Sequence, residues 1–268
     1  MVVNLIAQDR PTRNFSLQDV HVKGLQSIAD ACNQVGVGKF IHVSSAQAVN
    51  GALSNISCSR ADGEALLRQN YPKSVIVRPS ALFGYEDRFL HAIGTFSTFP
   101  LGFPVANHGR AKRSPLYIGD LAEGLTRLCL LDSAHIEGQT FDLLGPHQYT
   151  LHDIIKIFCY LTVRPEKIVN LSPLLFWLYA RLYPEWRRPL FTRDLIKMLQ
   201  EDEIRLEGSK SWPDLGMNVL ELKTLENHAL PFVRCYRQLE DFVKALPRLL
   251  PPEPLASVPS EQPIRKLQ

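Results

Sequence analysis

The 268-residue sequence lacks the short motifs that identify the commonest hydrolases, metalloenzymes and nucleoside triphosphatases. It contains no Walker loop, no GxSxG and no HExxH, which argues against P-loop phosphoryl transfer, an α/β-type serine hydrolase and a zinc peptidase. The five cysteines include no CxxC pair, so the sequence predicts neither a zinc site nor a redox pair, and we expect no metal.

Long apolar runs and a strong excess of one charge are also missing. The longest apolar runs are shorter than the roughly 20 residues that span a bilayer, so we expect no membrane-spanning segment. Thirty Lys and Arg residues against 27 Asp and Glu residues give a net charge of +3, which is too small to predict nucleic-acid binding. The 45% hydrophobic and 21% charged content is that of a globular protein and excludes overall disorder.

The first half of the chain alternates apolar strand patterns with helical patterns. We predict strands over 1–7, 39–45 and 74–79, separated by a helix that Ser16 caps and Gly36 ends and by a second helix near 60–69. Such alternation with short connections predicts a parallel sheet with right-handed crossovers.

The second half is predicted with less regular structure. Residues 85–113 have a loop-like composition, and a helix near 119–131 and a strand near 140–144 return to the sheet. Thr150, with Asp153 three residues on, is expected to cap a further helix. From about residue 165 the pattern is helical and punctuated by proline. We therefore divide the chain into a sheet domain (1–145), a helical domain (146–250) and a flexible tail (251–268).

The predicted strands end in small, mostly polar residues. They are Asn4, Ser44, Ser45, Pro79 and Ser80. Because ligands of open α/β sheets bind outside the carboxyl ends of the strands, these residues are candidate ligand contacts. The alternative is a local role: the serines bond nearby backbone groups, Asn4 satisfies the backbone of a loop, and a proline at a strand end is ordinary. His42 is interpreted as a packed core or interface residue.

The order of these segments resembles the extended short-chain dehydrogenase/reductase family. The matching pieces are the strand with Asn4, the strand ending Val43-Ser44-Ser45, the run Arg78-Pro79-Ser80-Ala81-Leu82-Phe83-Gly84 followed by Asp87, and Ser114–Ala122. The resemblance implies a Rossmann-like parallel sheet whose strand ends hold the nicotinamide half of NAD(P). It also implies a catalytic serine and a Tyr-xxx-Lys pair for proton transfer beside the hydride.

A set of weaker motifs is similar to one branch of that family, the nucleotide-binding accessory subunits of mitochondrial respiratory complex I. They occur in the same order along residues 1–245: Thr12-Arg13-Asn14-Phe15, Lys39–Ser44, Glu86–Leu90, Thr192-Arg193-Asp194 and Asp214-Leu215-Gly216. This resemblance implies contact with other complex I subunits, a place on the matrix side of the inner mitochondrial membrane, and NADP(H) as a structural cofactor.

Two features depart from the family pattern. The Gly-rich loop that holds the pyrophosphate is absent, and the Tyr-xxx-Lys positions carry Ile56 and Arg60. Isoleucine has no proton to exchange, so we expect a catalytically silent site, with Arg60 available for a ribose or phosphate contact.

The beginning of the chain adds a further expectation. A buried strand pattern opens the sequence, so we expect it to start at the family's fourth strand, without the first strands, the Gly-rich loop or an import signal. The adenine, ribose and phosphate contacts would lie mostly on the missing strands. Tight NADP(H) binding by this chain alone is therefore not expected.

An aromatic and basic segment stands out in the C-terminal half. It contains Phe176, Trp177, Tyr179, Arg181, Tyr183 and Trp186. Aromatics mixed with cations suit contact with a membrane surface or with a membrane-embedded partner, and the resemblance favours that interpretation over a core helix.

Three functions follow from these observations. The first is a non-catalytic accessory subunit of complex I that supports assembly or stability where the matrix and membrane arms meet. The second is an active NADP(H)-dependent reductase or epimerase, which Ile56 and the missing Gly-rich loop oppose. The third is a truncated isoform without an independent role.

Overall fold

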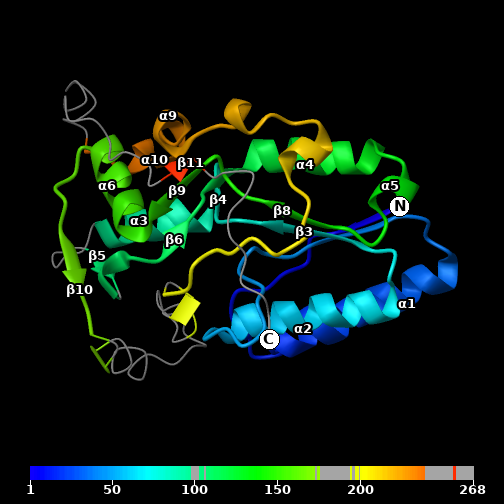
Figure 1. Cartoon of the computed structure of the whole chain (residues 1–268). Helices are drawn as coiled ribbons and strands as arrows, with labels where there is room; N and C mark the ends of the chain where they lie inside the picture. Colours follow the sequence, from blue (N-terminus) through cyan, green and yellow to red (C-terminus); the bar gives the residue numbers. More distant parts are fainter. Residues whose placement is uncertain are drawn as a thin grey trace.

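A four-stranded parallel sheet forms the centre of the molecule (Figure 1). In this computed structural model, the described residues are 1–97, 103–105, 107–172, 174–175, 194, 197–198, 200–238 and 256–257. The sheet has the order β1-β2-β3-β8, with every neighbouring pair parallel. The strands are β1 (Val2–Asn4), β2 (Phe40–Val43), β3 (Val75–Pro79) and β8 (Thr140–Leu143).

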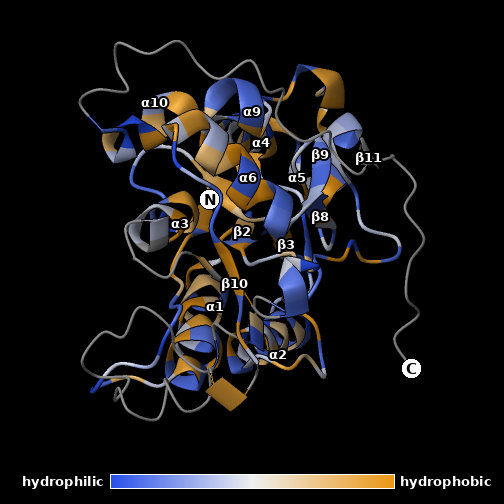
Figure 2. Ribbon diagram, turned by 90° about the vertical axis from the view of Figure 1, so that its left-hand side faces the viewer, coloured by the Kyte–Doolittle hydropathy of each residue, from blue (hydrophilic) through white to orange (hydrophobic). Residues whose placement is uncertain are grey.

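Helices cover both faces of this sheet. One face is covered by the π-helical turn Asp19–Gly24, α1 (Leu25–Val35) and α2 (Asn55–Asn70), and the other by α4 (Ile118–Leu130) (Figure 1). Alternate residues of the strands face the two layers: Phe40 and Ile76 pack with α1 and α2, whereas Ile41 and Val77 pack with α4. In the quarter-turn view, α1 and α2 carry both hydrophobic and hydrophilic residues, as expected for helices that bury one face (Figure 2).

The close packing of the π-helical turn Asp19–Gly24 against α2 depends on one glycine. A β-carbon at Gly63 of α2 would lie 2.3 Å from the carbonyl oxygen of His21. The absence of a side chain there lets the π-helical turn and α2 touch backbone to backbone. This contact places His21 next to the carboxyl ends of β1 and β2.

A second core lies beside the sheet and is built from both halves of the sequence. Phe83, Leu90 and Phe103 pack in it against Ile154 and Phe158 of the later helix α6. Its main elements are α3 (Arg88–Ser97), β5 (Phe103–Val105), β9 (His147–Thr150), α6 (Leu151–Thr162), β10 (Ile168–Asn170), α9 (Leu225–His228) and α10 (Leu230–Val233).

The chain then returns to the sheet. Lys210 forms a parallel bridge with Phe141 beside β8, and Trp212 and Leu215 are buried under α4. The two cores are therefore interleaved in sequence across residue 145, where the sequence pattern places a domain boundary. The remaining short elements are β4 (Leu82–Phe83), β6 (Lys112–Arg113), β7 (Leu116–Tyr117), α5 (Ser133–Ile136), β11 (Ala256–Ser257) and the 3-10 turns Asn107–Gly109, Trp212–Leu215, Val219–Glu221 and Arg234–Tyr236.

Three local predictions were wrong. Part of the expected loop 85–113 is the helix α3, whose apolar side packs on α6 in the second core. Part of the expected helical region after 165 is the strand β10, which pairs with β5. Within the expected flexible tail, Ala256 and Ser257 pair with β9 as β11; the rest of 251–268 lies outside the described residues.

The predicted start of the helix at Thr150 agrees with the structure. Thr150 and Asp153 form the expected capping box at the start of α6. The five cysteines are free. Among the described residues, no helix combines the length and hydrophobicity needed to cross a membrane.

Candidate functional site

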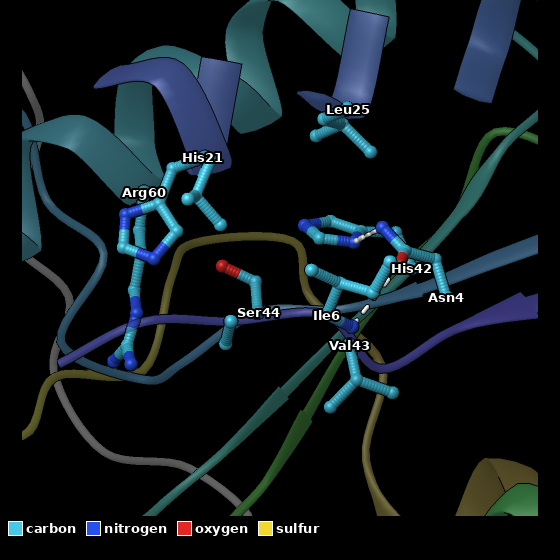
Figure 3. Close-up of a pocket in the computed structure, with 10 residues that line it drawn as sticks. Asn4, Ile6, His21, Leu25, His42, Val43, Ser44 and Arg60 are labelled. Carbon is cyan, nitrogen blue, oxygen red and sulfur yellow. Dashed lines mark hydrogen bonds between the residues drawn. The ribbon is translucent and has the colours of Figure 1, made fainter. Parts of the chain in front are cut away.

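A small pocket lies at the carboxyl ends of β1 and β2 (Figure 3). Its polar lining consists of Asn4, His21, His42, Ser44 and Arg60, and apolar residues including Val20 and Leu25 complete it. The structure therefore brings together three of the predicted site residues, Asn4, Ser44 and Arg60. It adds two histidines, one of which sequence analysis assigned to the core and the other of which it did not consider. The cavity volume is about 10 Å³, enough for roughly one water molecule.

Asn4 and His42 form a fixed pair across the two strands (Figure 3). The side-chain oxygen of Asn4 accepts a hydrogen bond from the backbone N–H of Ile6 at 3.1 Å, which turns the amide nitrogen toward Nδ1 of His42, also at 3.1 Å. Because the amide nitrogen only donates, Nδ1 must accept, and the proton of the neutral ring lies on Nε2. Burial, aided by the neighbouring His21 and Arg60, lowers the pKa of His42 to about 4.

His21 is held in the opposite tautomer. The backbone N–H of Gln8 donates to its Nε2 at 3.0 Å, so the ring proton lies on Nδ1 and is donated to the Ser59 hydroxyl at 2.8 Å. That hydroxyl in turn donates to the carbonyl of Ile56. Burial and the Arg60 charge lower the pKa of His21 to about 4. Both imidazoles are therefore neutral at pH 7 and supply no positive charge to the pocket.

The positive charge of the pocket comes from Arg60. Its guanidinium makes no ion pair or hydrogen bond with the residues that the structure describes. Burial lowers the pKa of Arg60. The Ser44 hydroxyl is near enough to Glu64 to lower the pKa of that carboxyl, yet it has no hydrogen bond of normal geometry in the described part of the chain. An unpaired cation and an unused hydroxyl on one pocket suit an anionic or hydroxyl-bearing ligand group.

The other three predicted residues do not line this pocket. The Ser45 hydroxyl accepts from the backbone of Gln47, and the carbonyl of Pro79 accepts from the backbone of Ala46. Ser80 is buried, and its hydroxyl donates to the carbonyl of Ser114. In the structure these three groups serve local backbone contacts, the alternative that sequence analysis left open.

A buried ionic cluster, which sequence analysis missed, lies directly below the pocket. Nε of Arg78 is 3.6 Å from Glu64 and 3.7 Å from Asp142, and the guanidinium donates to the carbonyls of Ser45 and Ala48. Burial raises the pKa of Glu64 to about 7, against the attraction of Arg78. The signal in the sequence is an arginine inside an otherwise apolar strand, Val75-Ile76-Val77-Arg78.

Ile56 lies in the first turn of α2 and is 2% exposed. Its buried side chain carries no group that exchanges a proton, and Arg60 follows one turn later. No group of three or more His, Cys, Asp or Glu residues that could bind a metal exists in the described ranges. The site therefore offers contacts for a ligand, and position 56 supplies no group that exchanges a proton.

These residues fit only part of a dinucleotide. The pocket provides one cation and one hydroxyl, which match a phosphate or a ribose, but a cavity of about 10 Å³ does not hold a nicotinamide ring. Phe176, Trp177, Tyr179, Arg181, Tyr183 and Trp186, predicted as an interface, lie outside the described residues.

The parallel sheet with helices on both faces defines a Rossmann-like α/β protein, as predicted. Solved structures with the same fold include dTDP-glucose 4,6-dehydratase from Bacillus anthracis in complex with NAD, with a TM-score of 0.60 and 15% identity over 90% of this chain and 73% of that one. RMD from Pseudomonas aeruginosa complexed with NADPH gives a TM-score of 0.58 and 12% identity over 88% of this chain and 80% of that one. No protein-family model matches the chain.

Relatives in sequence include subunits of mitochondrial NADH-ubiquinone oxidoreductase, which confirms the resemblance drawn from the motifs. The chain is 31% identical over 239 residues to the mitochondrial NADH-ubiquinone oxidoreductase 40 kDa subunit of Neurospora crassa, covering 87% of this chain and 61% of that protein. It is 31% identical over 248 residues to the mitochondrial NADH dehydrogenase [ubiquinone] 1 alpha subcomplex subunit 9 of Rattus norvegicus, covering 91% of this chain and 64% of that protein. The chain thus spans less than two thirds of the length of both relatives.

Proposed function

We propose that this chain acts as a non-catalytic accessory subunit of mitochondrial respiratory complex I, on the matrix side of the inner membrane. The observation that carries the proposal is the 31% identity to two complex I subunits over about nine tenths of the chain. The site supports it, because the position expected for the catalytic tyrosine holds the buried Ile56. Its role would be to support assembly or stability at the junction between the two arms.

The test is association with the complex in mitochondria. We expect an affinity-tagged chain to migrate with complex I on native gels and to co-purify with other complex I subunits. Loss of the chain should reduce the amount of assembled complex. The double substitution W177S/Y179S tests the predicted interface segment and should weaken co-purification, whereas the exposed Arg234→Gln should not. A chain that migrates only as a free species would contradict the proposal and favour a separate reductase or a by-product.

We further propose that NADP(H) is a structural ligand that contacts Arg60, Ser44 and Asn4 rather than a reactant. The unpaired guanidinium of Arg60 and the unused hydroxyl of Ser44 support this assignment, and the small pocket predicts weak binding by the isolated chain. Binding to the folded state alone would raise its stability by RT ln(1 + [L]/Kd). NADPH should therefore give a small increase in melting temperature that Arg60→Gln abolishes and Arg234→Gln preserves.

A large NADPH-dependent stabilisation that survives Arg60→Gln would show that the dinucleotide binds elsewhere. Oxidation of NADPH coupled to reduction of a carbonyl substrate would contradict the non-catalytic proposal.

A further inference from the structure

Three carboxylates from the stretch around residue 200 bind the backbone at the start of α2, where Ile56 lies, and in two neighbouring loops. They belong to Asp194, Glu201 and Glu203, which we name the acidic latch. Asp194 and Glu203 are buried, at 8% and 6% exposure. In Figure 1 the yellow segment near residue 200 lies next to the first turn of α2. No function proposed above uses these residues.

The first arm of the latch binds the start of α2. The carboxylate of Asp194 accepts from the backbone N–H groups of Asn55 at 2.6 Å and Ile56 at 2.8 Å. Glu201 accepts from the backbone N–H groups of Leu53 and Ser54. The first N–H groups of a helix have no partner within the helix and usually face solvent, a cap or a ligand. Here the chain itself occupies the N–H groups of Asn55 and Ile56, the first two residues of α2, and those of Leu53 and Ser54 just before the helix.

The second arm binds the loops at the carboxyl ends of the strands. Glu203 accepts from the backbone N–H groups of Ala81 and Ser114, both at 2.8 Å, and lies 3.6 Å from the guanidinium of Arg113. On the same segment, the carbonyl of Met198 accepts from the side chains of Gln47 at 3.3 Å and Arg113 at 2.8 Å. The acidic latch and Met198 thus contact the loops that follow β2 and β3 and the loop that precedes β7.

We propose that the acidic latch is a built-in closure, in which the chain's own carboxylates cover the start of α2 at Ile56 and keep substrates away from that position. None of the three carboxylates lines the pocket of Asn4, Ser44 and Arg60, so the latch leaves that pocket to the proposed NADP(H) contact. Open α/β sheets bind their ligands among the loops at the carboxyl ends of the strands, and these are the loops that the latch ties together. The proposal rests on the proposed non-catalytic function and deepens it, because it adds a steric reason for silence to the chemical one. Restoring a tyrosine at position 56 would not by itself restore access.

Hydrogen–deuterium exchange of the purified chain tests the closure without complex I, so its outcome is separate from that of the proposed function. D194A/E201A should increase exchange of the amides of 53–56 by about tenfold or more, since hydrogen bonds to charged groups are lost. E203A should act on Ala81 and Ser114 and leave 53–56 protected. The amide variant D194N/E201Q, which keeps one acceptor oxygen on each side chain, should be intermediate. Glu207→Ala, at an exposed acid of the same segment, is the matched control.

A second readout measures access directly. A cysteine at Ile56 should react with maleimide at least about tenfold more slowly than the exposed Cys235, and adding D194A/E201A should accelerate it. Protection of β3 shows that a variant is folded; if the double variant loses it, D194A and E201A are measured singly. Unchanged exchange at 53–56 in a folded variant, or fast labelling of the Ile56→Cys thiol with the latch intact, would overturn the proposal.

Discussion

Replacing Glu64 by glutamine should make the protein more stable at neutral pH and leave its stability unchanged in acid. Glu64 is buried, with Arg78 3.6 Å away as its ion-pair partner, and its pKa is raised to about 7 from the ordinary 4.5. Glutamine has nearly the same size and carries no charge. Arg78 keeps Asp142 at 3.7 Å and its backbone carbonyl partners, so the substitution does not strand the guanidinium.

The magnitude follows from the difference in pKa between the folded and unfolded chains. Each pKa unit corresponds to about 1.4 kcal/mol, so ionising Glu64 in the folded state costs about 3 kcal/mol more than in the unfolded state. Because the pKa of Glu64 is raised in the folded state, the stability that this residue contributes is fully present below about pH 4.5. That contribution is lost as the pH rises to about 7. The advantage of the glutamine variant should grow over the same interval and then level off.

Urea unfolding at a series of pH values from about 4.5 to 7.5 measures this difference. The free energies of unfolding of E64Q and the wild type should coincide at the acid end and separate by about 3 kcal/mol at the neutral end. Glu123→Gln, at an exposed acid paired with Arg127, is the control and should show no such trend. A pH-independent difference, or a glutamine variant that is less stable at neutral pH, would refute the assignment of Glu64 as a buried group that resists ionisation.

Three further predictions test the packing, the capping and the pocket. Gly63→Ala should destabilise the protein by about 1–3 kcal/mol, because its β-carbon would lie 2.3 Å from the His21 carbonyl oxygen; an unchanged melting temperature would contradict that contact. Thr150→Ala should cost about 1 kcal/mol by removing the cap of α6, whereas no shift of the urea midpoint would show that the capping box contributes nothing. In nitrogen NMR spectra, His42 should carry its proton on Nε2 and stay neutral until about pH 4, so the stability it contributes is present above pH 6.5 and is lost as the pH falls; titration near 6.5 would contradict its buried pairing with Asn4.

Much of the sheet could be predicted from local patterns. The strands β1, β2 and β3 read as short apolar runs between helical segments, and Thr150 with Asp153 marked the start of α6 by a short-range motif. The helix α3 could not be predicted in the same way. It lies in the stretch 85–113, which is rich in Gly, Phe and Pro, and its apolar side is stabilised by α6, which lies more than 50 residues later in the sequence.

The candidate site shows the same division. Strand ends identified Asn4 and Ser44, and the resemblance to the family's Tyr-xxx-Lys positions identified Arg60. The pocket does bring these three residues together. His21 went unnoticed because it comes from a helical segment rather than a strand end. Its place in the pocket depends on the close contact between its backbone and Gly63.

The sequence by itself determined the alternation of strands and helices, the family resemblance and the expectation that Ile56 and Arg60 stand at the family's proton-transfer positions. These are properties of neighbouring residues and fixed spacings. Only the tertiary structure decided which polar groups are paired: it placed Glu64 and Asp142 on either side of Arg78, and Asp194 on the first turn of α2. Such contacts join residues up to about 140 positions apart, and a local pattern carries no information on which distant carboxylate will meet a given amide or guanidinium.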